Sequence, residues 1–104
     1  MKSQSQSEAQ LLFVKAQEMY SSRSRIWSSK QSWLETGNFF QRAADQFQAE
    51  KLFKDAGDAF SKAAECHESG KAPVEATKAW IDAAEAYSHA YNCSEREQSI
   101  SANT

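Results

Sequence analysis

The chain has 104 residues, of which 40% are hydrophobic and 25% charged, and its formal net charge is −2. This length suits one small domain and excludes a two-domain enzyme, because domains usually run to roughly 100 to 200 residues. The composition is that of a globular protein and excludes a collagen-like or disordered chain. Only eight residues are β-branched whereas alanine recurs throughout, which favours helix over sheet. We therefore predict an all-α fold.

Neither a membrane span nor a secretory leader is expected. The chain contains no run of 18 apolar residues, and it begins with the polar segment 1–7. Cys66 and Cys93 lie 27 positions apart without CxxC spacing, so we expect inert, reduced thiols. These features predict a cytoplasmic protein with no cofactor and no metal.

Charge is distributed unevenly along the chain. Residues 1–33 carry five cations and two anions, a net charge of +3, whereas residues 34–104 carry seven cations and twelve anions, a net charge of −5. A nucleic-acid-binding protein would present a broad basic face, so we exclude nucleic acid as a partner. The cations instead form one small basic zone near the start.

A flexible tail over residues 1–6 is expected to precede a first helix over residues 7–20. The next segment, residues 21–31, is a loop longer than the two to eight residues usual between packed helices. It places Ile26 and Trp27 among serines and cations, where no helical stripe would bury them. The apolar side of the first helix comprises Leu11, Leu12, Val14, Lys15, Ala16, Met19 and Tyr20.

One phrase then occurs three times at a period of twenty residues: FQRAADQF at 40–47, FSKAAECH at 60–67 and WIDAAEAY at 80–87. In each copy an aromatic residue opens the phrase, two alanines follow three and four positions later, and a ring closes it seven positions after the first. The spacing i, i+3, i+4, i+7 is the stripe of an amphipathic helix. Each unit is therefore predicted to be one helix and one short turn, with helices at about 32–48, 51–68 and 73–91.

The helix boundaries are marked unequally. Gly70 and Pro73 separate the last two helices, because glycine tolerates positive φ and proline lacks the N–H that a helix start does not need. The segment between Phe47 and Leu52 is poorly marked, so one long helix over residues 32–68 is an alternative. In such a helix the stripe would rotate by about 200° over twenty residues, which favours a turn. Residues 93–104 are polar and lack periodicity, and we expect them to be disordered.

The runs AGDAFSKAAECH at 56–67 and EATKAWIDAAEAY at 75–87 closely resemble the amino-terminal helical hairpins of the soluble NSF attachment proteins, the SNAP/Sec17 family. The preceding Ala-Ala helix and the serine-rich, hydrophobic first loop match in the same order. The resemblance covers roughly Glu8 to Tyr91 and implies a short right-handed α-solenoid of TPR-like antiparallel hairpins, about four helices in all.

The resemblance also implies a non-enzymatic adaptor for vesicle-mediated transport. Such adaptors lie along the syntaxin-type SNARE four-helix bundle left after membrane fusion and recruit the NSF-type AAA+ ATPase that disassembles it. The family engages this ATPase through a C-terminal helical bundle, which residues 1–104 do not include, so NSF is the least supported of these partners. By resemblance the protein is cytoplasmic and peripheral to the membrane.

Two sets of candidate site residues follow from the resemblance. In the first loop, Ile26 and Trp27 are expected to insert into a membrane surface while Arg23, Arg25 and Lys30 lie among the headgroups. Burying a large apolar side chain contributes roughly 1.5–3 kcal/mol and each cation about 1 kcal/mol, so contact would be weak and reversible. The alternative is that Trp27 packs back onto the first helix. The candidate SNARE-facing cations, each of which could instead be simply solvated, are Arg42, Lys54, Lys62 and Lys78.

Other readings remain open. His67 occupies a ring position of the repeat, so a packing role is preferred to a metal or catalytic one. No phosphate-binding glycine loop or serine elbow is present, which leaves a generic helical-repeat scaffold as the main alternative function. An enzyme or enzyme regulator would need a pocket of convergent polar groups. We also expect the fourth helix to expose Trp80, Tyr87 or Tyr91, and hypothesise that such a chain self-associates or is marginally stable.

Overall fold

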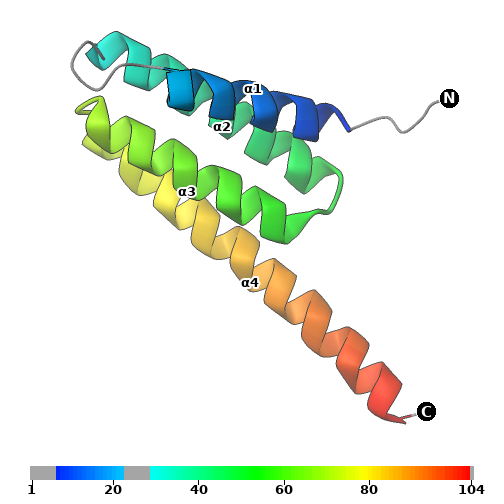
Figure 1. The fold of residues 1–104 in the computed structure, drawn as a ribbon. Coiled ribbons are helices and arrows are strands. Elements are labelled where there is room, and N and C mark those ends of the chain that lie inside the picture. Colours follow the sequence, from blue (N-terminus) through cyan, green and yellow to red (C-terminus); the bar gives the residue numbers. More distant parts are fainter. Residues whose placement is uncertain (1–6, 23–28, 104) are drawn as a thin grey trace, which may run out of the picture.

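Four helices make up the part of the chain that the structure describes. The computed structural model describes residues 7–22 and 29–103, as α1 (Glu8–Ser22), α2 (Lys30–Ala49), α3 (Phe53–Ser69) and α4 (Pro73–Asn103) (Figure 1). These residues include no strand, and the all-α prediction is confirmed. The alternative of one helix over residues 32–68 is wrong, because α2 and α3 are separate. None of the described helices is both long enough and apolar enough to cross a bilayer.

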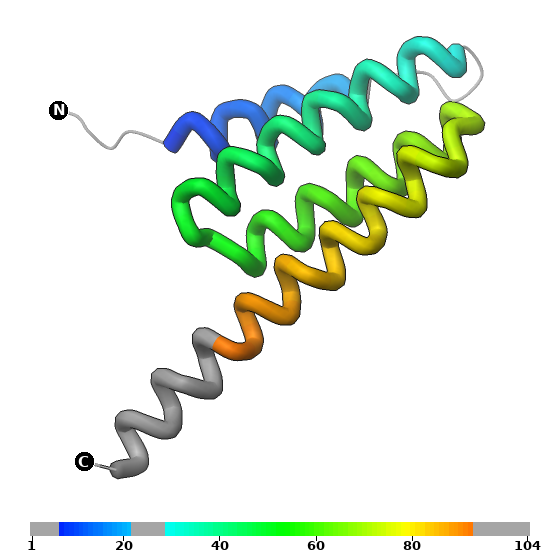
Figure 2. The backbone as a smooth tube through the Cα atoms, turned by 180° about the vertical axis from the view of Figure 1, so that it is seen from behind, coloured from blue at the N-terminus to red at the C-terminus, as the bar shows by residue number. Residues whose placement is uncertain are grey.

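The helices form two layers in which each helix packs mainly on its neighbours in sequence, α1 on α2, α2 on α3 and α3 on α4. Helices α1 and α3 lie in one layer, and α2 and α4 lie in the other (Figures 1 and 2). This is the arrangement of a helical-repeat solenoid, in which each unit buries its apolar face against the next.

A serine residue caps the amino-terminal end of each of the first two helices. Ser7 Oγ accepts a hydrogen bond of 3.1 Å from the Gln10 N–H, and Ser29 Oγ accepts one of 3.0 Å from the Ser32 N–H. Each bond satisfies a backbone donor that the helix leaves without an internal partner. The second cap explains why α2 begins at Lys30, inside the predicted loop over residues 21–31.

The turns after α2 and α3 repeat at the same twenty-residue period as the helices. Lys51 and Lys71 both adopt φ of 64°. Behind them, the N–H of Leu52 donates to the Phe47 carbonyl and that of Ala72 to the His67 carbonyl, both at 2.8 Å. These bonds, from two residues past the C-cap back into the last turn, define a Schellman motif. The short turn between α2 and α3 was poorly marked in sequence because lysine, and not glycine, occupies its left-handed position.

Gly70 differs from the expectation that it supplies positive φ. It is the C-cap of α3 with φ of −86°, and Lys71 takes the left-handed conformation instead. A Cβ added at Gly70 would lie 2.7 Å from Leu34 Cδ2 of α2. The glycine therefore permits the close approach of α2 to the end of α3.

Two copies of the repeated phrase form the centre of the core. Phe40, Phe47 and Phe60 are at most 2% exposed, and the alanine pairs between the rings are fully buried, which lets the helices approach closely. The buried alanines of these two copies are Ala43, Ala44, Ala63 and Ala64.

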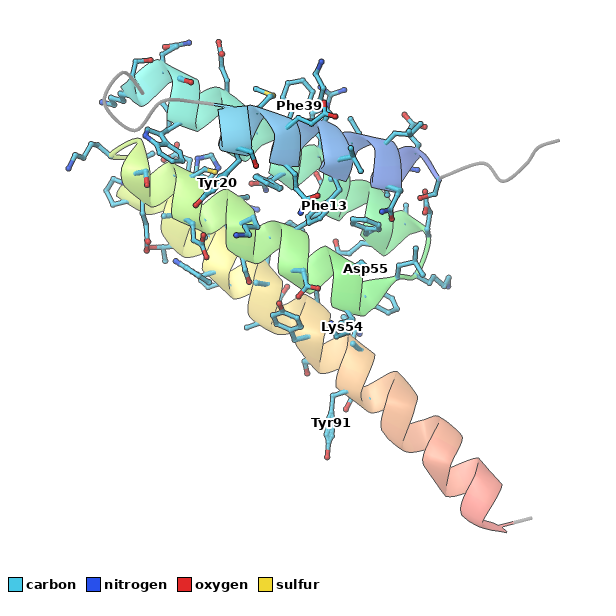
Figure 3. The ribbon with its side chains drawn as sticks, viewed as in Figure 1. Phe13, Tyr20, Phe39, Lys54, Asp55 and Tyr91 are labelled. Atoms are coloured by element: carbon cyan, nitrogen blue, oxygen red, sulfur yellow. The ribbon has the colours of Figure 1, made fainter. Side chains whose placement is uncertain are left out.

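Phe13 completes this core, although the predicted apolar side of the first helix omitted it. Its ring lies 5.5 Å from that of Phe40 and 5.9 Å from that of Phe47, both in edge-to-face geometry, and it projects from α1 toward the neighbouring helices (Figure 3). Phe13, Ala16 and Tyr20 have the spacing of ring, first alanine and closing ring in the repeat. That spacing is the signal by which the sequence could have identified Phe13.

The third copy of the phrase is only half buried. Ala83 faces α3 and is buried, whereas Trp80 and Tyr87 are 40% and 39% exposed and Ala84 is exposed. Within the described residues no further helix covers this side of α4. The expectation that the fourth helix exposes its rings is confirmed.

Helix α4 is longer than predicted, because it continues to Asn103 where we expected an end near residue 91 and a disordered segment over residues 93–104. At the positions where the preceding units turn, with Glu50-Lys51 and Gly70-Lys71, this unit has Ala90-Tyr91. No glycine or proline occurs after Pro73, so the sequence contains no strong helix terminator.

Candidate functional site

The layer formed by α1 and α3 contains a hollow beside the start of the first loop. Its volume is about 410 Å³, and Gln17, Tyr20, Ser21, Phe40 and Lys62 line it. The Lys62 ammonium lies 5.1 Å from the centre of the Tyr20 ring, close enough for a cation–π contact. The hollow therefore combines an aromatic floor with a cation, a hydroxyl and an amide at its rim. These groups suit an acidic side chain.

Lys62 is partly neutralised within its own helix. Its ammonium is 3.8 Å from Glu65 Oε1, and both side chains are more than two-fifths exposed. An exposed pair of this kind contributes little to stability. Lys62 therefore remains available to an external acidic group at small cost.

Lys54 lies on the same helix, about two turns away along α3 (Figure 3), and it takes part in a chain of polar contacts that reaches α4. Its ammonium is 3.5 Å from Asp58 Oδ2, and the Tyr87 hydroxyl donates a hydrogen bond of 2.5 Å to Asp58 Oδ1. Burial raises the pKa of Tyr87, the hydrogen bond to Asp58 raises it further, and one to Ser61 opposes the shift. Tyr87 thus stays a neutral donor that ties α4 to α3.

Lys78 belongs to the other layer. Its ammonium lies 3.1 Å from Asp82 Oδ2, and both charges act on Asp45 of α2. The pKa of Asp45 is raised chiefly by burial and then by the Asp82 carboxylate, while Lys78 lowers it. The positive charge of Lys78 therefore offsets the negative charges of Asp82 on α4 and Asp45 on α2.

The four predicted SNARE-facing cations are consequently divided between two layers. Lys54 and Lys62 lie on α3, whereas Arg42 on α2 and Lys78 on α4 lie in the opposite layer. The Arg42 guanidinium stacks 5.3 Å from the centre of the Phe39 ring of its own helix. A partner that lies along the α1 and α3 layer would contact Lys62 and Lys54 without reaching the other two.

Most of the predicted membrane-contact residues lie outside the described residues, namely Arg23, Arg25, Ile26 and Trp27. Lys30 is described, as the exposed first residue of α2. It follows the capping residue Ser29, and it stands where the first loop returns to the helices.

His67 packs in the interior, as its ring position in the repeat predicts. It is 3% exposed, and its Nδ1 atom has no hydrogen-bond partner among the side chains and backbone that the structure describes. A Cβ added at Gly37 of α2 would lie 3.3 Å from that nitrogen. Burial lowers the pKa of His67, and the charge of Glu75 opposes this only in part. The imidazole is therefore held neutral between α2 and α3.

The side chains that the structure describes include no group of three or more His, Cys, Asp or Glu residues able to hold a metal ion. The Cys66 side chain is fully buried. The sequence did not identify the hollow beside Tyr20, because its lining comes from three helices and depends on how α1 lies across α3. Gln17 follows Phe13 by four positions and Ser21 follows Gln17 by four, so the stripe that contains Phe13 could have placed both on one face of α1, but not beside Lys62 of α3.

Comparison with known families supports the resemblance read from the sequence. A family model described as soluble NSF attachment protein, SNAP, matches residues 6–102, a span that includes α1 to α3 and all of α4 except its last residue. No curated protein and no solved structure matches the chain. The predicted family is confirmed over nearly the whole chain.

Proposed function

Because the chain belongs to the family of soluble NSF attachment proteins, whose members are non-enzymatic helical adaptors, we propose that it binds SNARE four-helix bundles at a membrane surface in vesicle-mediated transport. The observation that carries the proposal is the hollow between α1 and α3, where Lys62 lies over Tyr20. It offers one partly exposed cation beside an aromatic surface, and it lies next to the first loop.

The bundle is proposed to lie along the α1 and α3 layer. An acidic side chain of the bundle would pair with Lys62 while its aliphatic part packs on Tyr20. Lys54 would add a second cation further along α3. Paired contacts of this kind steer association and set the register more than they add affinity. Arg42 and Lys78 serve the fold of the opposite layer in this arrangement.

Membrane contact is proposed for the first loop, with Ile26 and Trp27 inserted and Arg23, Arg25 and Lys30 near the headgroups. The basic zone of residues 1–33 has a net charge of +3, which suits an anionic surface. The protein would thus be cytoplasmic and peripheral. Individually weak contacts with membrane and bundle would reinforce one another when both are present.

Pull-down on an assembled SNARE bundle tests the bundle contact. Lys62→Glu and Lys54→Glu are expected to weaken binding, with the larger effect from Lys62, whereas Lys71→Glu in the exposed turn before α4 serves as a matched charge reversal with no effect. Equal retention of all three variants would contradict the proposal. Equal binding to unrelated helical peptides would support a generic scaffold instead.

Co-sedimentation with anionic vesicles tests the membrane contact independently. The double substitution Ile26→Ser/Trp27→Ser is expected to reduce the bound fraction, and binding should also fall with added salt. Unchanged binding of the double variant would remove the loop from the proposal. Repeating the bundle pull-down with and without an NSF-type ATPase shows whether these 104 residues recruit that partner.

A further inference from the structure

Helix α4 carries an apolar face that nothing in the described structure covers. Among the described side chains, five of the seven exposed large hydrophobic residues lie on α4, and Figure 3 shows Tyr91 pointing away from the other helices. The helix buries a separate stripe against α3, which includes Ala76, Ala79 and Ala83. Because α4 is apolar on two sides, it has the composition of a helix between two partners. The residues of this open face are Val74, Thr77, Trp80, Ile81, Ala84, Tyr87, Ser88 and Tyr91.

The two central rings of the open face are already anchored in their own chain. Trp80 Nε1 donates a hydrogen bond of 2.9 Å to Glu68 Oε2, and the Tyr87 hydroxyl donates one of 2.5 Å to Asp58 Oδ1. Their polar atoms are therefore satisfied, while about two-fifths of each side chain remains exposed. A partner therefore needs to supply only apolar and small side chains. Aromatic rings held in fixed positions are the usual anchors of such interfaces.

The internal repeat shows what kind of element covers such a face. Forty residues earlier, α2 presents Gly37, Phe40, Ala44 and Phe47 in the equivalent positions, and all four are buried. Helix α3 runs antiparallel to α2 and approaches this face at Gly37 through Cys66 and His67, while Phe13 of α1 packs beside Phe40 and Phe47. The equivalent face of α4 is therefore shaped for an antiparallel helix that places small residues between rings.

Helix α4 itself meets this description. We propose that two copies of the chain pair through their α4 helices, antiparallel and about a two-fold axis at Ala84. This register places Trp80 opposite the second copy's Ser88, Tyr91 opposite its Thr77, and Ile81 opposite its Tyr87. Each exposed ring then meets a small or aliphatic residue, and Ala84 meets its own copy at the point of closest approach. The pairing is independent of the proposed SNARE and membrane contacts.

A two-fold pairing fits the surface better than a head-to-tail stack. A stack would need a second apolar face at the α1 end, since heterologous contacts join two different surfaces. Among the described side chains of α1, only Leu11 is an exposed large hydrophobic residue, and Lys15, Gln17 and Glu18 are exposed beside it. The face complementary to α4 is thus found on α4 of a second copy.

Sedimentation equilibrium of the 104-residue chain over a wide concentration range tests the pairing. We expect a monomer–dimer equilibrium that saturates at the dimer. Ala84→Glu places two carboxylates at the axis and should weaken dimerisation by roughly 100-fold or more, the loss typical of a disrupted interface centre. Ala49→Glu, at an exposed alanine of α2, is the matched control and should leave the dimer unchanged. Far-UV circular dichroism confirms that both variants retain their helices.

Charge exchange tests the register. Thr77→Lys and Tyr91→Glu should each weaken the dimer roughly tenfold, whereas the double variant should recover most of the loss at low salt. Recovery is expected because the introduced lysine of one copy lies opposite the introduced glutamate of the other. Within one chain these two positions are fourteen residues apart, so the pair can form only between two copies. Failure of the double variant to recover would overturn this register.

Three other outcomes would overturn the pairing itself. One is a chain that stays monomeric at concentrations of about 1 mM, where even weak specific dimers form. Another is a dimer that Ala84→Glu leaves intact. The third is open-ended association into oligomers larger than a dimer, abolished by Leu11→Lys. Such association would require the surface of α1 and would indicate a head-to-tail stack.

Discussion

The ring of Tyr87 on α4 lies directly against Gly57 on α3. A Cβ added at Gly57 would be 2.6 Å from both Cδ1 and Cε1 of that ring, a distance that no real Cβ contact allows. The absence of a side chain at position 57 therefore lets Tyr87 reach Asp58 and bond to it at 2.5 Å. One missing methyl group in α3 determines how α4 is attached.

We predict that Gly57→Ala destabilises the protein by about 1–2 kcal/mol. Alanine favours a helix over glycine by about 1 kcal/mol, but the displaced ring loses both its packing and its hydrogen bond, an overpacking cost of typically 1–3 kcal/mol. Urea unfolding followed by circular dichroism measures the difference. In a Tyr87→Ser background the same substitution should become stabilising, since nothing then opposes the added methyl. A stabilising effect in the unaltered chain would contradict the contact.

We predict that Phe13→Ala is much more damaging than Leu11→Ala, although both alter large apolar residues of α1. Phe13 contacts the rings of Phe40 and Phe47, and removing a core aromatic costs roughly 3–5 kcal/mol. Leu11 is 56% exposed, so its truncation should cost less than about 0.5 kcal/mol. Thermal and urea unfolding compare the two variants. Similar losses in both would show that α1 does not pack through Phe13.

We predict that Lys51→Gly and Lys71→Gly each stabilise the protein by about 0.5–1 kcal/mol. Both lysines adopt φ of 64°, which costs a residue with a Cβ roughly 1–2 kcal/mol, and glycine recovers part of this after its larger loss of backbone entropy. Lys54→Gly, in the first turn of α3, is the control and should destabilise the protein, because glycine is a poorer helix former than lysine. The change in melting temperature measures the effect of each of the three substitutions. If glycine at positions 51 and 71 lowered the stability as it does at position 54, the left-handed turn geometry would be refuted.

We predict that acid weakens the fold through His67. Burial lowers its folded-state pKa below the ordinary value of 6.5, so the unfolded chain binds a proton at a higher pH than the folded chain. Above about pH 7 the imidazole is neutral in both states and its titration has no effect on stability. As the pH falls through 6.5 toward the lowered folded pKa, the unfolded state is stabilised and the free energy of unfolding decreases.

His67→Phe isolates this contribution, since phenylalanine occupies the equivalent position at Phe47. The free energy of unfolding, measured in urea between pH 5 and 8, should fall less steeply with acid in the variant than in the unaltered chain. For each protein, the free energy of unfolding at pH 8 serves as the reference. The cost of fitting the larger ring beside Gly37 is the same at every pH and therefore does not affect the slope. Identical slopes would show that the His67 imidazole is not buried in its neutral form.

Much of the fold could be predicted from short-range pattern. The repeated ring, alanine pair and ring predicted the helices that contain Phe40, Phe60 and Trp80, because the i, i+3, i+4, i+7 spacing is a property of one helix alone. The end of α2 was harder to predict, because Lys51 adopts the left-handed conformation without glycine. The end of α4 was misplaced, since polarity alone suggested disorder where no helix terminator exists.

The candidate site depended more on tertiary structure. The sequence proposed Lys62 as one of four equivalent cations, and only the packing of α3 beside α1 distinguished it by placing it over Tyr20. Gln17 and Ser21 entered the site through the same packing. Lys78 instead pairs with Asp82 of its own helix, and its charge lowers the pKa of Asp45 on α2, an effect that no sequence spacing between residues 45 and 78 indicates.

The sequence by itself determined that the chain is helical, that it repeats every twenty residues, and that it resembles the SNAP family. Tertiary structure decided which copies of one phrase are buried: Phe40 and Phe60 are enclosed, while Trp80 remains 40% exposed. The physical reason is that helical periodicity arises from local backbone geometry, whereas burial requires a second surface. Equivalent side chains therefore differ in exposure according to the helix that lies, or does not lie, against them.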